Sequence, residues 1–95
     1  MYKIVYRPRA LEELEDSLRW YGEKSKKVAE NFKEAIKEKI ESIKESPKQN
    51  PKKYKNYYEA KLKKYPFVII YIVEDERILI VAIFHQKRNP KKKYK

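Results

Sequence analysis

The stretch FVIIYIVEDERILIVAIF, residues 67–84, decides the fold. It holds two apolar runs of seven residues, Phe67–Val73 and Ile78–Phe84, separated by the charged residues 74–77. Short apolar runs that are rich in β-branched residues and divided by a polar turn predict two antiparallel strands. Seven residues are far fewer than the roughly 20 that cross a bilayer as a helix. We therefore expect a cytoplasmic protein with no membrane partner.

Further strands and two helices are predicted on the amino-terminal side of this stretch. Residues 58–63 alternate between apolar and polar side chains, which indicates a third strand ahead of Phe67. Residues 47–56 are rich in proline, asparagine and lysine and predict a loop. Residues 2–7 are rich in β-formers and predict a first strand.

Two amphipathic helices fill the interval between the first strand and the loop. One is expected from Pro8 to Gly22, and the other is expected to be capped by Ser25 and stopped by Ser46-Pro47. The whole pattern predicts an α+β fold: an N-terminal strand, an α-helical hairpin, then a three-stranded antiparallel meander forming one sheet. We expect residues 1–95 to form a single domain.

The two central strands are apolar on both faces, although two helices can cover only one face of the sheet. Alternate residues from Phe67 to Val73 form one apolar face, and Val68, Ile70 and Ile72 form the other. An antiparallel sheet with a solvated face normally alternates apolar and polar residues. Either a protein partner covers the second face, or the tail or the long loop folds over it.

The formal net charge of +11 is concentrated in the second half of the chain. Residues 1–46 carry 11 Lys/Arg and 10 Asp/Glu, whereas residues 47–95 carry 14 and 4. Such one-sided charge favours an anionic partner such as nucleic acid, the alternative being a lysine-rich solubilising surface. The chain has no cysteine and one histidine, so we expect no metal site; with no glycine-rich phosphate loop, we expect no small-molecule cofactor either.

The candidate functional residues lie mainly at the end of the last strand. His85 is a candidate general acid or base, and Arg88 a candidate bidentate ligand of a phosphate. Alternatively, His85 makes a structural hydrogen bond at the strand end, and Arg88 pairs with an acid on the first helix. The remaining candidates would bind RNA through charge or ring stacking, or are simply solvated: Lys61, Lys63, Lys64, Lys87, Tyr58 and Tyr94.

Three stretches of the sequence resemble the RelE/ParE toxins of bacterial type II toxin–antitoxin systems. The first joins YKIVY, residues 2–6, to ALEEL, residues 10–14. The second is LKKYPFVIIY, residues 62–71, and the third is AIFHQKRNPKK, residues 82–92. Together they extend over almost the whole chain in the order typical of that superfamily.

The resemblance implies a growth-inhibiting toxin that is held by a cognate antitoxin. RelE-type members cut messenger RNA on the ribosome, and His85 and Arg88 match the ending of such toxins. The resemblance therefore favours an endoribonuclease of the mRNA interferase type that inhibits translation, with ribosome and mRNA as partners. The alternatives are a ParE-like inhibitor of DNA gyrase, which hydrolyses nothing, and a non-toxic nucleic-acid-binding domain.

Overall fold

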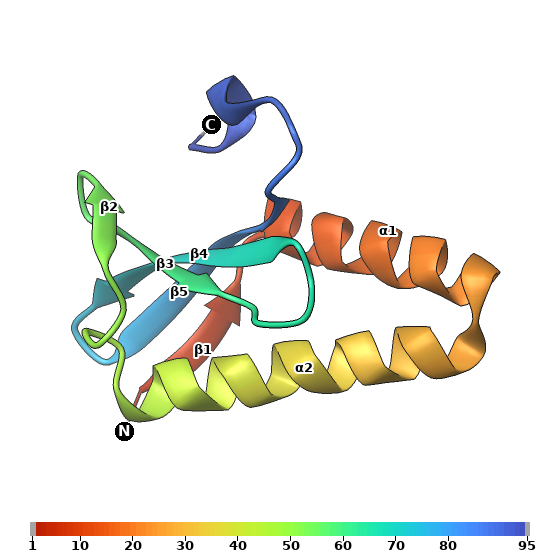
Figure 1. The fold of residues 1–95 in the computed structure, drawn as a ribbon. Coiled ribbons are helices and arrows are strands. Elements are labelled where there is room, and N and C mark those ends of the chain that lie inside the picture. The colour runs from red at the N-terminus through yellow and green to blue at the C-terminus, as the bar shows by residue number, and fades with distance from the viewer. Residues whose placement is uncertain (1, 95) are drawn as a thin grey trace.

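The computed structural model describes residues 2–94 and has the expected α+β fold, with a helical hairpin packed against one mixed sheet (Figure 1). In chain order the elements are β1 (Lys3–Tyr6), α1 (Pro8–Lys24), α2 (Lys26–Glu45), β2 (Lys52–Tyr54), β3 (Tyr57–Lys61), β4 (Phe67–Glu74), β5 (Arg77–His85) and the short 3₁₀ helix η1 (Pro90–Lys92). The sheet order is β1-β5-β4-β3-β2. β1 pairs with β5 in parallel, and the other neighbouring strands are antiparallel.

The sheet has five strands, one more than expected, because β2 lies inside the stretch predicted to be a loop. β2 pairs with β3 through Lys52 opposite Tyr58 and Tyr54 opposite Tyr57. Its residues show no apolar alternation, so no sequence pattern indicated a strand. The turn after it depends on Lys55, whose φ of 49° is uncommon for a residue other than glycine.

The helices end close to the expected residues, with one difference at Gly22. α1 continues past this glycine to Lys24, and Ser25 then caps α2 by accepting a hydrogen bond from the Val28 N–H at 3.4 Å. A Cβ added at Gly22 would lie 3.9 Å from the Ala29 Cβ, an ordinary contact distance, so this glycine does not end α1 and no close contact requires it.

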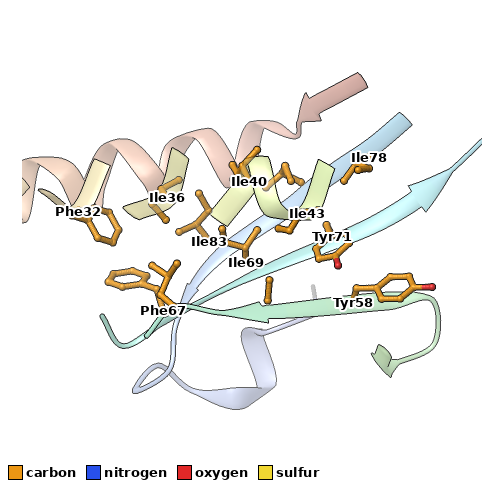
Figure 2. Packing of buried hydrophobic residues seen from close by; sticks show 14 residues of the cluster. Phe32, Ile36, Ile40, Ile43, Tyr58, Phe67, Ile69, Tyr71, Ile78 and Ile83 are labelled. Carbon is orange, nitrogen blue, oxygen red and sulfur yellow. The ribbon is translucent and has the colours of Figure 1, made fainter. Parts of the chain in front are cut away.

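The main core lies between α2 and the inner face of the sheet. Phe32, Ile36, Ile40 and Ile43 project from α2 toward the side chains of β4 and β5 (Figure 2). Phe32 and Ile43 are fully buried, and burial of each such side chain contributes about 1.5–3 kcal/mol. Alternation along β4 places Phe67, Ile69 and Tyr71 in this core.

The second apolar face of the sheet is covered by the chain itself, which was one of the two alternatives. Its buried residues are Val68, Ile70, Ile72, Leu79, Val81, Ala82 and Phe84. Tyr57 from β3 and Tyr94 from the tail pack against them, joined by Val5 at the β1 edge. The tail with η1 accordingly lies on the side of the sheet opposite the helices (Figure 1).

Tyr71 holds the segment that follows α2 against the sheet. Its hydroxyl donates to the Pro47 carbonyl oxygen at 2.6 Å and accepts from the Asn50 side-chain amide at 3.1 Å. The segment is therefore tethered at two points before β2 begins. Among residues 2–94, no helix combines the length and the apolar character needed to cross a bilayer.

Candidate functional site

β5 extends beyond its parallel partner β1, and beyond the end of β1 the Glu13 side chain accepts a backbone hydrogen bond from β5. β1 pairs with β5 only as far as Ile80, whereas the pairing of β5 with β4 continues to His85. Beyond β1 the Ile83 N–H donates to the Glu13 carboxylate of α1 at 2.9 Å. Glu13 is only 8% exposed, so this bond satisfies a donor inside the protein.

The second oxygen of Glu13 engages Arg88. Glu13 Oε2 lies 3.1 Å from Arg88 Nη1 and 3.3 Å from Arg9 Nε. Arg88 therefore makes the salt bridge to an acid on the first helix that the sequence offered as its structural role. With its charge compensated in this way, Arg88 is a weaker ligand for a phosphate than a free arginine would be.

His85 also makes the structural hydrogen bond considered for it. Its Nδ1 accepts from the Lys87 N–H at 3.0 Å, and its ring meets Phe67 edge-on at 4.9 Å between centroids. Burial lowers the pKa of His85, and the positive charges of Lys87 and Arg88 lower it further. The ring is therefore neutral near pH 7, and because Nδ1 is an acceptor the proton resides on Nε2.

His85 and Arg88 share one pocket of about 350 Å³ between α1 and the end of β5. The α1 wall is formed by Glu13, Asp16, Ser17, Trp20 and Tyr21, and the sheet wall by Phe67, Ile83, His85 and Arg88. Most of these groups are apolar or acidic. The pocket brings the two predicted catalytic residues together, without any of the predicted lysines.

A separate groove of about 570 Å³ lies between the tail and the face of the sheet that carries no helix, which we call the open face. Lys53, Lys61, Lys93, Gln86 and Tyr94 are among the residues that line it. Glu59 is also there, only 8% exposed, paired with Lys93 Nζ at 2.9 Å and hydrogen-bonded by the Tyr94 hydroxyl. We call this the open-face groove.

The remaining predicted residues lie elsewhere. Lys63 and Lys64 line a third depression, about 660 Å³, between α2 and the β3–β4 connection, where Glu34 and Glu38 also lie. Tyr58 is buried in the main core and stacks on Tyr71, so its face is not open to a base. Lys87 is exposed in the turn after β5.

Sequence reasoning missed Glu13 and Glu59, the two buried acids. No sequence pattern except helical phase, three residues from the buried Ala10, distinguishes Glu13 from the other acids of the first helix. Glu59 lies between Tyr58 and Ala60 in a predicted strand, and this apolar setting is the signal that could have indicated a half-buried carboxylate. Among the described residues, no three His, Cys, Asp or Glu side chains are grouped so that they could hold a metal ion.

Comparison with known families gives one match that extends over most of the chain. The family model described as the ParE toxin of type II toxin–antitoxin system, parDE, matches residues 4–90. No curated protein sequence is similar enough to count as a match.

Solved toxin structures share the fold at low sequence identity. A chain of the chromosomal ParDE system from P. aeruginosa superimposes with a TM-score of 0.78 at 18% identity, covering 90% of this chain and 96% of that one. A chain of the intact E. coli RelBE complex gives a TM-score of 0.66 at 22% identity, covering 93% and 100%. The isolated E. coli RelE toxin gives 0.66 at 20% identity, covering 98% and 93%.

Proposed function

Because the chain belongs to the ParE toxin family of type II toxin–antitoxin systems, we propose that it stops bacterial growth by binding its target without cutting RNA. The proposed target is DNA gyrase. The proposed partner that restrains it is a cognate antitoxin, as the similar ParDE and RelBE systems pair a toxin with an antitoxin. This reverses the preference for RNA cleavage that the sequence alone suggested.

The observation that carries the proposal is the separation of the predicted site residues. Stabilising the charge that develops on a cleaved phosphate requires donors and cations that converge on one point. Here His85 and Arg88 line the α1 pocket, Lys61 lines the open-face groove, and Lys63 and Lys64 line the depression along α2. Among residues 2–94, none of these three depressions holds the histidine together with a lysine.

The carboxylates paired with the cations of these depressions also favour binding over RNA cleavage. Arg88 is paired with Glu13, and Lys93 is paired with Glu59 inside the open-face groove. A buried carboxylate repels a phosphate brought near it and compensates the cation that would receive it. These surfaces suit binding better than catalysis.

RNA cleavage remains the second candidate because of one observation. His85 and Arg88 do face a common pocket, where the neutral imidazole keeps an Nε2–H donor next to a guanidinium. A message that displaced Glu13 from Arg88 would meet both groups at once.

Assays with purified protein separate the two candidates. We expect inhibition of supercoiling of relaxed plasmid by gyrase, accumulation of gyrase–DNA adducts, and no cleavage of translated messages on ribosomes. The His85→Ala variant should keep the supercoiling inhibition. Ribosome-dependent mRNA cleavage that disappears in His85→Ala, with gyrase unaffected, would overturn the proposal in favour of an mRNA interferase.

A further inference from the structure

One face of α1 is bordered by two adjoining depressions. The pocket of about 350 Å³ that holds His85 is followed by a second depression of about 390 Å³, and Glu13, Asp16 and Arg88 line both. The α1 residues of the two depressions are spaced three or four apart, which places them on one side of the helix. We call this surface the α1 trough; its α1 side chains are Arg9, Glu12, Glu13, Asp16, Ser17, Trp20 and Tyr21.

Trp20 lies at one end of the α1 trough. It is the only tryptophan of the chain, and 55% of it is exposed. Its ring meets Tyr21 edge-on at 5.1 Å between centroids, and Tyr21 in turn packs against the main core. Tryptophan is enriched among the residues that dominate the binding energy of protein interfaces. A supported, exposed tryptophan at the margin of an apolar pocket therefore indicates a docking point for a protein side chain.

The charge of α1 is opposite to that of the molecule as a whole. α1 carries five acids and three bases, a net charge of −2, whereas the chain carries +11. Glu12, Glu15 and Glu23 make no ion pair within residues 2–94. A basic partner is repelled by most of this protein, and the field of α1 orients the protein so that this helix faces such a partner.

Trp20 and Asp16 together match the chemistry of an arginine side chain. Lys24 Nζ lies 5.2 Å from the centre of the Trp20 ring, so the ring already attracts a cation. Asp16 pairs with Arg19 through Oδ1 at 3.0 Å, and both side chains are more than half exposed, which makes the pair weak and exchangeable. A planar guanidinium can stack on a tryptophan and bind a carboxylate at the same time.

The other end of the α1 trough is less suited to a cation. Arg9 and Lys92 line it, and Arg88 lies between the two depressions. The arginine of a partner is therefore expected at the Trp20 end.

We propose that the α1 trough docks a basic polypeptide segment of the target enzyme, with an arginine guanidinium stacked on Trp20 and bound to Asp16. This inference rests on the proposed inhibition of gyrase and names the surface that performs it. An enzyme that binds DNA carries lysine- and arginine-rich surfaces that neutralise phosphates. Such a surface is complementary to α1 and repels the rest of the protein.

Inhibition of gyrase supercoiling by the full chain tests the proposal. Trp20→Ala should raise the inhibitory concentration about thirtyfold, the effect of losing a dominant interface residue. Asp16→Lys should raise it about tenfold, because it places a cation where the guanidinium binds. The matched control Glu30→Lys makes the same charge change at an exposed acid of α2 and should leave the inhibitory concentration unchanged. Circular dichroism checks that each variant folds.

A second measurement does not require gyrase. Because Trp20 is the only tryptophan, its fluorescence reports directly on this end of the trough. Titration with a nona-arginine peptide should change the emission until it saturates, and nona-lysine should be less effective because an ammonium cannot stack as a planar guanidinium does. Asp16→Lys should weaken the response to nona-arginine, and Glu30→Lys should not.

The failure of this docking surface can be distinguished from the failure of the proposed function. Equal inhibition of gyrase by the unmodified protein, Trp20→Ala and Asp16→Lys would overturn the surface and leave gyrase inhibition standing. If the unmodified protein does not inhibit gyrase, the proposed function fails, and unchanged emission with nona-arginine would then reject the surface as well. Self-association in analytical ultracentrifugation that Trp20→Ala abolishes would make a second copy of the chain the occupant instead. If Trp20→Ala does not fold, the exposed Asp16→Lys variant decides.

Discussion

Glu13 joins three segments of the chain through its two carboxylate oxygens. One oxygen accepts from the backbone of β5, and the other binds Arg9 on its own helix and Arg88 after β5. The neighbouring acids Glu12, Glu15 and Asp16 are exposed, although they are of the same chemical type. Helical phase alone distinguishes Glu13 from them.

Replacing Glu13 should therefore destabilise the fold strongly. We expect Glu13→Ala to lower the free energy of unfolding by about 3 kcal/mol, because it leaves the Ile83 N–H unsatisfied and Arg88 unpaired. Glu13→Gln should cost about 1 kcal/mol, since its amide oxygen can still accept from Ile83. Urea unfolding measures both. The control is Glu15→Ala, an exposed change that should cost about 0.5 kcal/mol or less; equal losses at positions 13 and 15 would contradict this role.

His85 should make stability fall on mild acidification. Its pKa in the folded protein lies below the ordinary value of 6.5, so the unfolded chain binds more protons as the pH drops below that value. The contribution is fully present above about pH 6.5 and is lost as the pH falls through the lowered pKa. Protonation at Nδ1 would also remove the acceptor of the Lys87 N–H.

The matched variant for this prediction is His85→Gln. Denaturant midpoints measured from pH 7.5 to about pH 5 should fall less steeply for the variant than for the unmodified protein. Because the carboxylates titrate in both proteins, the difference between the two curves reports His85. Parallel curves would mean that the histidine does not contribute.

At the scale of elements, periodic segments could be predicted and paired contacts could not. The helical hairpin and the strands β4 and β5 follow from their 3.6-residue and two-residue patterns. β2 has three exposed residues and exists only through its pairing with β3, which no local pattern encodes. His85 and Arg88 were placed correctly at the end of β5, but their partners are set by the packing of α1 on the sheet.

The tether between Tyr71 and the segment after α2 should be detectable when its hydroxyl is removed. Tyr71→Phe leaves the Pro47 carbonyl and the Asn50 amide without this partner and should lower the free energy of unfolding by about 1–2 kcal/mol. Limited trypsin digestion should then cut faster at Lys48. The same exchange at Tyr65, whose hydroxyl has no partner among the described residues, should change neither quantity.

At the scale of the whole molecule, the charge asymmetry of the sequence becomes an asymmetry in space. The basic second half supplies β2, β3 and the tail, whose residues line most of the open-face groove. The acids of the first half lie mostly along α1 and α2. A net charge of +11 on so small a protein repels itself, and salt screens this repulsion.

Sodium chloride should therefore raise the thermal midpoint by a few degrees between low and physiological ionic strength. Lys33→Glu/Lys37→Glu replaces one positive by one negative charge at each position, lowering the net charge from +11 to +7, and should make the salt dependence shallower. Differential scanning fluorimetry, with sucrose as an uncharged control, provides the measurement. A midpoint that falls with salt would show that local ion pairs outweigh the overall repulsion.

The parallel pairing of β1 with β5 determines when the fold can be completed during synthesis. Among the described strands, β1 leaves the ribosome first and its partner β5 leaves last. Because β1 can pair only after β5 has been made, the sheet closes only after nearly all of the described chain has been translated. The Glu13–Arg88 bridge forms later still, because Arg88 follows β5. A partly translated chain therefore lacks the closed sheet, and any activity that needs the sheet begins only once β5, which ends at His85, has left the ribosome.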